Sequence, residues 1–402
     1  MDAIRQIQAF NRGREAERLA LKYQAMRTDA FGFLRGSCHL FYARLSPTGP
    51  LRTAPLAWCC GDLHLANFGS YKGDNRQVYF DLNDFDESVL APASWDMLRL
   101  LGSVWVAGGV LGLGRDDTRR LCGDVMTGYA DTLAAGKAFW AERDIASGDV
   151  RALLDGLRDR QRPAFLDART RLKGRRRVLA TDTGKALPAT AAQRKTVKAF
   201  MADFAARQPV PRFYKVLDVA RRVAGTGSLG VERYSVLVSG KGSPDGNYLL
   251  DLKRARPSSL ASLSPAPQPS WPTEAHRIVA LQQRLQAVPM AFLQPVQMDG
   301  RAFVMRELHP SEDSLSYRRI AKRPRQDPGP QGLLATMGRL TAWAHLRSAA
   351  RQGAAGPDEL IDFGARQKWR AKLLDAAEAA ALQVGRDHAA FSAAYDAGAF
   401  GR

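Results

Sequence analysis

The stretch that decides the fold prediction is Gly61-Asp62-Leu63-His64-Leu65-Ala66-Asn67, which is followed by Asn83-Asp84-Phe85-Asp86. A short apolar segment precedes each motif: residues 54–60 (APLAWCC) and residues 78–82 (VYFDL) both predict strands. Polar residues that directly follow a strand belong to its exit loop. The two motifs are therefore expected on two loops of one structural unit.

Asp62, Asn67 and Asp84 are residue types that a phosphoryl-transfer site requires. Such a site needs a carboxylate that orients the acceptor hydroxyl, and oxygen ligands that hold Mg²⁺ against the phosphates. Mg²⁺ typically takes one or two carboxylates together with phosphate and water. We predict Asp62 as the orienting carboxylate and Asn67 and Asp84 as metal ligands. Two alternatives stay open: the residues are ordinary turn residues, or Asp81, within the strand pattern, is the metal ligand.

A glycine-rich segment, Gly225-Thr226-Gly227-Ser228-Leu229-Gly230, fits the pattern G-x-G-x-x-G. A dinucleotide-binding fingerprint needs a helix next, but residues 231–238 (VERYSVLV) have strand composition. A glycine turn between antiparallel strands covers the phosphates in kinases. The phosphates of ATP, or of another nucleoside triphosphate, are therefore predicted to contact Gly225, Gly227, Ser228 and Gly230. Lys253, after a strand over residues 248–252, is predicted to contact the α- and β-phosphates, and a solvated surface lysine is its alternative.

The first motif resembles the catalytic loop of aminoglycoside phosphotransferases and choline kinases, usually written H-G-D-x-x-x-x-N. The resemblance implies that Asp62 is the catalytic Asp and that Asn67 and Asp84 bind metal. It also implies that Asp96, in Trp95-Asp96-Met97-Leu98, braces the catalytic loop. One departure is Cys60, which stands where those families have a mainly structural His, so the difference concerns the bracing of this loop more than the chemistry.

The order of the motifs differs from that of ordinary kinases, in which the glycine loop and lysine come first. The resemblance implies an α+β, protein-kinase-like two-lobe fold in circularly permuted order, which is tolerable when the termini lie close together. The expected parts are a large lobe over residues 1–210, a small lobe over 211–308 and a helical return over 309–402. Residues 301–308 are expected to act as the hinge, and Glu274 is the only acidic residue in the helix that would supply a partner for Lys253.

Across nearly the whole chain, the motifs resemble the bacterial family of domains of unknown function 2252. The segments that carry this resemblance are Phe33-Leu34-Arg35-Gly36, GDLHLANFG, FDLNDFDE, GTGSLGVERYSVLV, Leu252-Lys253-Arg254-Ala255 and Ala344-His345-Leu346-Arg347. Arg254 departs from the family, whose members usually have an acidic residue after the lysine. The family's activity is not established, so the resemblance adds supporting candidates rather than a substrate: Arg35, His64, Asp86, Asp96 and His345. For His345, a satisfied helix histidine is the alternative.

Periodicity and turn signals predict the remaining elements. Residues 1–45 are expected to be helical with a turn at Phe31–Gly36, and residues 94–136 form helices with a break at Gly112-Leu113-Gly114. Thr273 is the expected N-cap of a helix ending near residue 288, and Asp299-Gly300 indicates a hairpin. Further helices are expected at 331–351 and 365–396. Asp362-Phe363-Gly364 spells a kinase metal motif, but no catalytic loop precedes it, and we interpret it as a helix cap.

The charge and composition restrict the classes of protein. The 402 residues carry a formal charge of +19 and a pI near 10.2, so the surface attracts anions. Residues 157–196 are basic and are either a solvated loop or a phosphate-binding arm. Four cysteines without metal-ligand spacing are expected to be buried, reduced thiols. The absence of a membrane-length apolar run and of a signal-peptide core indicates a cytoplasmic protein without membrane insertion.

These observations favour an ATP- and Mg²⁺-dependent phosphotransferase with a small-molecule hydroxyl acceptor. Alternatives are a nucleotide-binding regulator without turnover (a pseudokinase) and a nucleotidyl transferase on the same fold. A nucleic-acid binder that uses residues 157–196 is a further, less favoured hypothesis, because it explains none of the acidic motifs.

Overall fold

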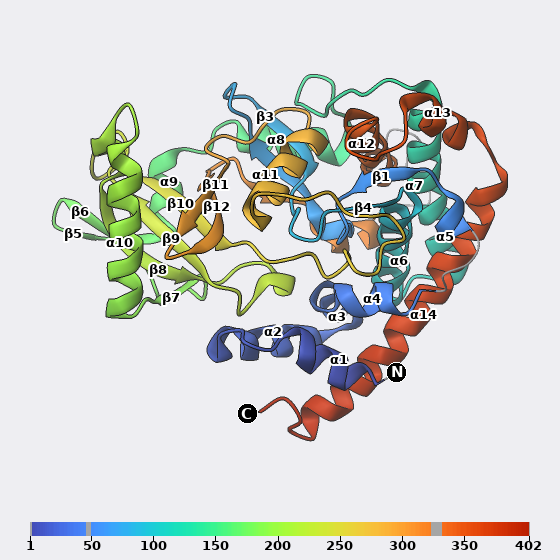
Figure 1. Ribbon diagram of the computed structural model, residues 1–402, viewed down its shortest axis with the longest axis horizontal. Helices are drawn as coiled ribbons and strands as arrows, with labels where there is room; N and C mark the ends of the chain where they lie inside the picture. Colours follow the sequence, from blue (N-terminus) through green and yellow to red (C-terminus); the bar gives the residue numbers. More distant parts are fainter. Residues whose placement is uncertain (1, 46–49, 323–331, 402) are drawn as a thin grey trace.

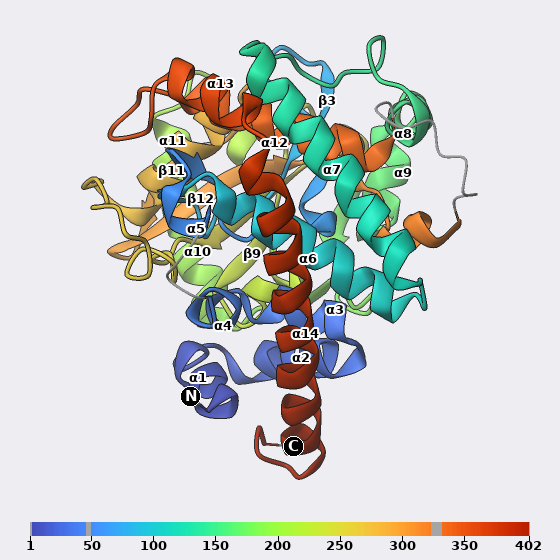
Figure 2. The same ribbon diagram turned by 90° about the vertical axis from the view of Figure 1, so that its right-hand side faces the viewer.

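The computed structural model describes residues 2–45, 50–322 and 332–401. The chain is a mixed α+β protein in which a six-stranded antiparallel sheet lies beside a mainly helical region (Figure 1). The first helix, α1 (Ala3–Phe10), and the end of α14 (Lys368–Asp396) lie at the same end of the molecule (Figures 1 and 2). Gln8 Nε2 donates a hydrogen bond to the Ala399 carbonyl at 2.9 Å. The two ends of the chain are therefore neighbours.

The helical region is built around α6 (Ser94–Val110), whose residues are buried along almost its whole length. Around it pack α7 (Arg115–Ala135), α12 (Leu333–Ser348) and α14, and α13 (Pro357–Ala365) packs against α7 (Figure 2). Helices α7 and α12 meet through glycines: a Cβ on Gly338 would lie 2.2 Å from the Val125 carbonyl oxygen, and one on Gly128 would lie 2.2 Å from that of Ala335. Only glycine permits this close approach of two backbones.

The large sheet has the strand order β11-β12-β10-β9-β8-β7. Its bounds are β7 (Ala186–Pro188), β8 (Val216–Arg222), β9 (Arg233–Val238), β10 (Tyr248–Arg254), β11 (Gln294–Met298) and β12 (Arg301–Leu308). Alternate residues face opposite sides. Tyr234, Val236 and Val238 share a hydrophobic cluster with residues of α10 (Ala191–Ala206), which covers one face, whereas Arg233 and Ser235 belong to the opposite side. The face of the sheet opposite α10 therefore carries polar side chains.

Three short sheets complete the strand structure. β1 (Leu56–Cys59) pairs with β4 (Val89–Pro92), and β2 (Phe68–Lys72) pairs with both β3 (Val78–Leu82) and β13 (Asp313–Ser314). β5 (Thr170–Lys173) and β6 (Arg176–Leu179) form a hairpin. The first four of these strands hold the GDLHLAN and NDFD motifs. β13 follows β12 after a short connection, so the chain passes directly from the large sheet to the motif strands.

Most of the predicted elements are confirmed. The predicted strands correspond to β1, β3 and β8–β12, and Thr273 caps α11 (Glu274–Leu285) by accepting the His276 N–H. Asp299 and Gly300 have φ values of 51° and 69°, as a two-residue hairpin turn requires. All four cysteines are free and buried. None of the helices within the described residues has the length and apolar character needed to cross a membrane.

Four predictions about local structure are wrong. Residues 31–36 lie in α3 (Ala30–Gly36) rather than in a turn, because Phe31, Phe33 and Leu34 are buried. Residues 157–196 are not a solvated loop: they contain α9 (Arg162–Asp167), β5, β6, β7 and the start of α10, the last preceded by a capping box at Thr190. Asp362-Phe363-Gly364 lies inside α13 and is not a cap. Residues 301–308, expected to act as the hinge, form an inner strand of the large sheet, and a short connection over residues 309–312 leads from it to β13.

The remaining helices precede or follow these elements. They are α2 (Ala16–Thr28), α4 (Cys38–Ala43), α5 (Pro50–Thr53) and α8 (Gly148–Leu157), with short 3₁₀ turns at Leu65–Asn67, Pro211–Tyr214, Thr226–Ser228 and Tyr317–Lys322. Helices α2 and α3 lie below the large sheet in Figure 1 and approach the turn at Thr226–Ser228. This placement brings the N-terminal segment against the glycine-rich segment.

Candidate active site

The loop that contains Asp62 (residues 60–67, the Asp62 loop) is held by Asp96 at the start of α6. Asp96 Oδ2 accepts the Cys60 N–H at 2.7 Å, and Oδ1 accepts the Gly61 N–H at 2.8 Å. His345 Nε2 lies 3.3 Å from Asp96 Oδ2, and its Nδ1 lies 2.9 Å from the Tyr129 hydroxyl. His345 is therefore a satisfied buried histidine that orients Asp96, so Asp96 supplies the bracing for which the sequence offered no histidine at position 60.

Asp62 itself is fixed by a buried arginine. Asp62 Oδ1 accepts hydrogen bonds from Arg99 Nε at 3.0 Å and Arg99 Nη2 at 2.7 Å. Burial raises the pKa of the Asp62 carboxyl, although the Arg99 charge opposes that shift. The Asp62 side chain keeps 17% of its surface exposed, whereas that of Arg99 has none. One carboxylate oxygen is thus anchored by Arg99.

Asn67 and His64 support this loop from within. Asn67 Nδ2 donates to the Asp62 carbonyl oxygen at 2.5 Å. The amide oxygen of Asn67 takes no part in this hydrogen bond. His64 Nδ1 accepts the Ala66 N–H at 3.2 Å, and its Nε2 lies 4.0 Å from Asp62 Oδ2. Burial lowers the pKa of His64, so the ring is neutral. A neutral ring in these contacts is suited to bracing the loop.

The loop after β3 (residues 83–88, the Asp84 loop) brings two carboxylates to Lys253 of β10. Lys253 Nζ contacts Asp86 Oδ2 directly and lies 3.8 Å from Asp84 Oδ1. Burial raises the pKa of Asp84 despite the nearby lysine. Burial acts in the same sense on Asp86, but the charge and hydrogen bond of Lys253 outweigh it and lower the pKa of Asp86. Asp86 is therefore the main ion-pair partner of Lys253, and Asp84 keeps 40% of its side chain exposed.

The glycine-rich segment (residues 225–230, the glycine loop) lies over Asp62. Gly225 and Gly230 have φ values of 73° and 83°, which glycine adopts without strain. A Cβ on Gly227 would lie 3.1 Å from the Arg35 carbonyl oxygen and 3.9 Å from Asp62 Oδ2. Ser228 Oγ donates to Asp86 Oδ2 at 3.3 Å. The loop thus contacts both acidic loops.

Two cations of the N-terminal segment hold the glycine loop in this position. Arg14 Nη1 donates to the carbonyls of Gly227 and Leu229 at 2.7 and 2.9 Å, and Lys22 Nζ donates to that of Gly227 at 3.2 Å. Burial lowers the pKa of Lys22, and the Arg14 charge adds to the effect. Sequence reasoning missed both residues, because a lysine or arginine in a polar segment carries no local sign of a partner about 200 residues away.

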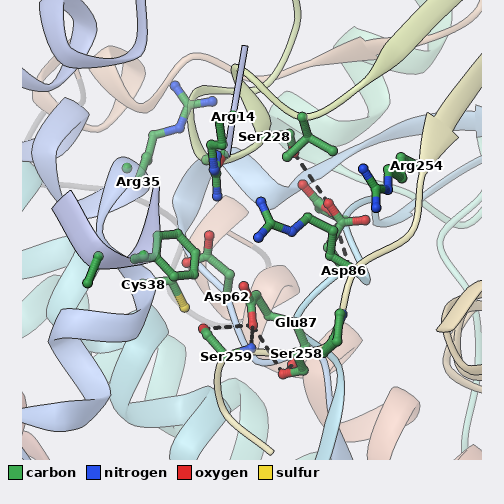
Figure 3. A pocket seen from close by; sticks show the side chains of 18 residues that line it. Arg14, Arg35, Cys38, Asp62, Asp86, Glu87, Ser228, Arg254, Ser258 and Ser259 are labelled. Carbon is green, nitrogen blue, oxygen red and sulfur yellow. Dashed lines mark hydrogen bonds between the residues drawn. The ribbon is translucent and has the colours of Figure 1, made fainter. Parts of the chain in front are cut away.

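A cavity of about 380 Å³ connects these groups (Figure 3). Its walls come from the N-terminal helices, both acidic loops, the glycine loop and the segment after β10. The lining residues that carry charge are Arg14, Arg35, Asp62, Asp84, Asp86, Glu87, Arg254 and Arg256. The cavity therefore joins the predicted residues Asp62, Asp84, Asp86, Gly227 and Ser228 with Arg35. Asn67, His64, Asp96, His345 and Lys253 are not among its lining residues, but Lys253 contacts the lining residues Asp84 and Asp86 through ion pairs.

Asp81, the alternative metal ligand, is engaged away from the cavity. It is buried and accepts the N–H groups of Leu82 and Ala287. It also pairs with Arg347 at 3.3 Å. These contacts occupy the carboxylate with structural partners, so Asp84 is the better candidate for a metal ligand in this part of the chain.

Glu274, the only acidic residue of the helix that would supply a partner for Lys253, pairs with Arg277 of its own helix. Arg277 Nε donates to Glu274 Oε2 at 2.6 Å. Arg277 also donates to the carbonyls of Asp86 and Ser88. The arginine therefore fixes the Asp84 loop to α11, and the glutamate orients that arginine.

A second buried charge cluster lies on the same side of the large sheet, and no sequence motif indicated it. Asp251 of β10 pairs with Arg222 at 2.7 Å, with Arg306 at 3.3 Å and with Arg233 in direct contact. These arginines outweigh the effect of burial and hold the pKa of Asp251 well below its ordinary value. The cluster joins β8, β9, β10 and β12 behind Lys253, so it fixes the strand that carries the lysine.

We expect Asp251→Ala to destabilise the protein strongly. Removing the carboxylate leaves three arginines without their shared buried partner, which should lower the free energy of unfolding by about 3–5 kcal/mol. Urea unfolding followed by circular dichroism measures this loss. Asp182→Asn is the matched control, because its pair with Arg171 is solvent-exposed and contributes about 0–1 kcal/mol. Equal effects of the two substitutions would contradict the assigned role of the cluster.

Comparison with known proteins places the chain in a family. The profile of one family, described as uncharacterized protein conserved in bacteria (DUF2252), matches residues 14–394. Because the match spans most of the sequence, the chain belongs to this family, and the resemblance to it is confirmed. No curated protein and no solved structure matches the chain. All the motifs described above lie within the matched residues.

Proposed function

We propose that the protein is an ATP- and Mg²⁺-dependent phosphotransferase of kinase-like, circularly permuted fold that acts on a small-molecule hydroxyl group. One observation carries the proposal. The glycine loop, from the second half of the chain, lies against Asp62 and is bonded to Asp86, while Lys253 contacts both Asp84 and Asp86. Segments about 140 to 170 residues apart thus bring the candidate base, a candidate metal ligand and the candidate phosphate-binding groups together.

The residues present fit a Mg²⁺ ion. Asp84 is partly exposed, and its contact with Lys253 is loose enough to leave carboxylate oxygens for coordination. The Asn67 side chain uses its amide nitrogen on the Asp62 carbonyl, which leaves its oxygen as the donor atom. One amide oxygen and one carboxylate match the hard-oxygen preference of the ion. When bound, the ion neutralises phosphate charge.

Each of the side chains described above would carry out one part of the phosphoryl transfer. The bond between the γ-phosphorus and the β–γ bridging oxygen of ATP breaks, a bond to the acceptor oxygen forms, and ADP leaves. Asp62 accepts the hydroxyl proton through the carboxylate that Arg99 holds in place. Lys253 and the backbone N–H groups of the glycine loop bind the phosphates. Arg14 and Lys22 keep that loop closed over Asp62.

A catalytically weak nucleotide-binding regulator is the second candidate. The ion pair of Lys253 favours this candidate, because the lysine contacts Asp86 of the Asp84 loop and not a glutamate from α11. A lysine held by the acidic loop can still bind nucleotide while being badly placed for transfer. ATP binding that survives Asp62→Ala, with no turnover by either form, would select this candidate. Mass analysis of a modified acceptor would reveal a nucleotidyl transferase instead.

The first test is nucleotide-dependent stabilisation and turnover of the purified protein. Ligand binding to the native state at about 100 times Kd adds about 2.7 kcal/mol of stability. We therefore expect Mg²⁺-ATP to raise the Tm, EDTA to reverse the shift, and ADP to accumulate slowly. The absence of both stabilisation and turnover would refute the proposal.

The pH dependence of turnover should follow Asp62. Asp62 acts only when ionised, and burial raises its pKa, so activity should fall on acidification at a higher pH than for an ordinary carboxyl, near 4. Arg99→Gln removes the charge that opposes this shift and should move the acid limb of kcat/KM to still higher pH. Arg99→Lys, which keeps the charge, should move it less. An acid limb that neither substitution moves would show that Asp62 is not the titrating base.

A further inference from the structure

Three arginines line the cavity without an ion-pair partner in the part of the chain that the structure describes. Among the described residues, the guanidinium groups of Arg35, Arg254 and Arg256 make no ion pair or hydrogen bond, although the Arg256 carbonyl accepts from Arg277 Nη2 at 3.1 Å. The Arg35 Nε is buried and lacks a hydrogen-bond partner in the described part of the chain. A guanidinium group binds carboxylates and phosphates through bidentate hydrogen bonds. These three are therefore available to a ligand.

The acidic residues of the cavity are already engaged. Asp62 is paired with Arg99, and Asp86 with Lys253. Glu87 Oε2 accepts hydrogen bonds from the Ser259 N–H at 2.7 Å, the Ser259 hydroxyl at 2.9 Å and the Ser258 hydroxyl at 3.1 Å. Glu87 thereby fixes the segment 254–259 against the Asp84 loop. What remains for a ligand is the positive charge of the arginines and the exposed part of Asp84.

The arginines stand on both sides of the cavity. Figure 3 shows Arg14 and Arg35 on the side of the N-terminal helices and Arg254 on the opposite side, with Asp62 and Glu87 below them. Burial lowers the pKa of Arg14 to about 10, and the charge of Arg256 contributes to this decrease. An anion between these walls would relieve this repulsion, whereas an amine-bearing acceptor would increase it.

We propose that the acceptor of the transfer is an anion, a hydroxylated compound with a phosphate or carboxylate group, and that Arg254 and Arg256 bind this group while its hydroxyl reaches Asp62. The inference rests on the proposed function and adds the substrate class to it. The same arginines could instead receive the phosphates of the nucleotide, because the chemistry is shared. Lys253, the neighbour of Arg254, already lies at Asp84 and Asp86. The nucleotide phosphates therefore have their own cation, and the two arginines one and three residues further along are left for the acceptor.

The test is calorimetric titration of inorganic phosphate into the full-length protein with and without saturating Mg²⁺-ADP. We expect phosphate to bind in the presence of Mg²⁺-ADP, and the double variant Arg254→Gln/Arg256→Gln to raise its Kd at least about tenfold, as loss of charge-assisted hydrogen bonds does. The matched control is Arg175→Gln/Arg366→Gln, which removes two exposed charges outside the cavity and should leave Kd unchanged. Binding should also persist in Asp84→Asn.

Each other outcome is informative. Displacement of phosphate by Mg²⁺-ADP would assign the arginines to the nucleotide and overturn the proposal, as would the absence of phosphate binding or equal binding by both double variants. If Mg²⁺-ADP fails to bind while phosphate binding still depends on Arg254 and Arg256, the proposed function fails and the anion site stands. The two proposals are thus separately refutable.

Discussion

Asp84→Asn is expected to abolish the Mg²⁺-dependent part of nucleotide binding. The substitution keeps the size of the side chain and removes the one carboxylate of the Asp84 loop that is loosely paired and partly exposed. Stabilisation by Mg²⁺-ATP at about 100 times the wild-type Kd, on the order of 3 °C in Tm for a chain of this length, should therefore disappear. Differential scanning fluorimetry with and without EDTA measures it.

Asp86→Asn is the informative companion of this variant. Asp86 is the principal ion-pair partner of Lys253 and accepts from Ser228, so its loss should loosen the glycine loop and weaken binding without removing the requirement for Mg²⁺. If Asp84→Asn retained the full Mg²⁺-dependent shift and Asp86→Asn lost it, the metal-ligand assignment would pass to Asp86.

Asp62→Asn is expected to lower turnover by about 10²- to 10⁴-fold, the usual contribution of a positioned general base. Nucleotide binding should persist, because Asp62 faces the acceptor side of the proposed transfer and Lys253 remains in place. Turnover is measured as ADP release, and binding as the Mg²⁺-ATP shift in Tm. Retained binding with lost turnover would separate an enzyme from a pseudokinase.

The effect of Asp62→Asn on stability, through its partner Arg99, needs a control. Asn at position 62 leaves a fully buried guanidinium without its carboxylate, which lowers stability in its own right. Asp62→Glu keeps the charge and displaces the base by one methylene group, so it should preserve folding better and still reduce turnover. Wild-type turnover by Asp62→Asn would rule out Asp62 as the base.

The sequence predicted those parts of the molecule that depend on local signals. The strands before the two motifs, the glycine turn between β8 and β9, the Thr273 cap and the Asp299-Gly300 hairpin all rest on residues within one short window. The role of Asp96 followed from a motif in a known order, and its hydrogen bonds to Cys60 and Gly61 agree with it. Such features need no knowledge of distant contacts.

What could not be predicted depends on contacts between distant segments. Arg99 lies in an apolar helix, where a single charged residue indicates only an interruption of the apolar pattern. In the structure it is the ion-pair partner of Asp62. Arg14 and Lys22 belong to ordinary polar segments but donate to Gly227. The basic segment 157–196 was interpreted from its charge, whereas part of that charge is satisfied inside the fold: Arg177 is buried and pairs with Asp167 and Asp245. Burial of these cations is a tertiary effect.

The central claim is that Asn67, Asp84, Lys253 and the glycine loop form one metal–nucleotide site. A crystal grown with Mn²⁺ and a non-hydrolysable ATP analogue tests it most directly through the anomalous signal of the metal. The account predicts one Mn²⁺ coordinated by the Asp84 carboxylate and the Asn67 amide oxygen, with analogue phosphates beneath residues 225–230. A nucleotide bound elsewhere, or Mn²⁺ held without either residue, would contradict it.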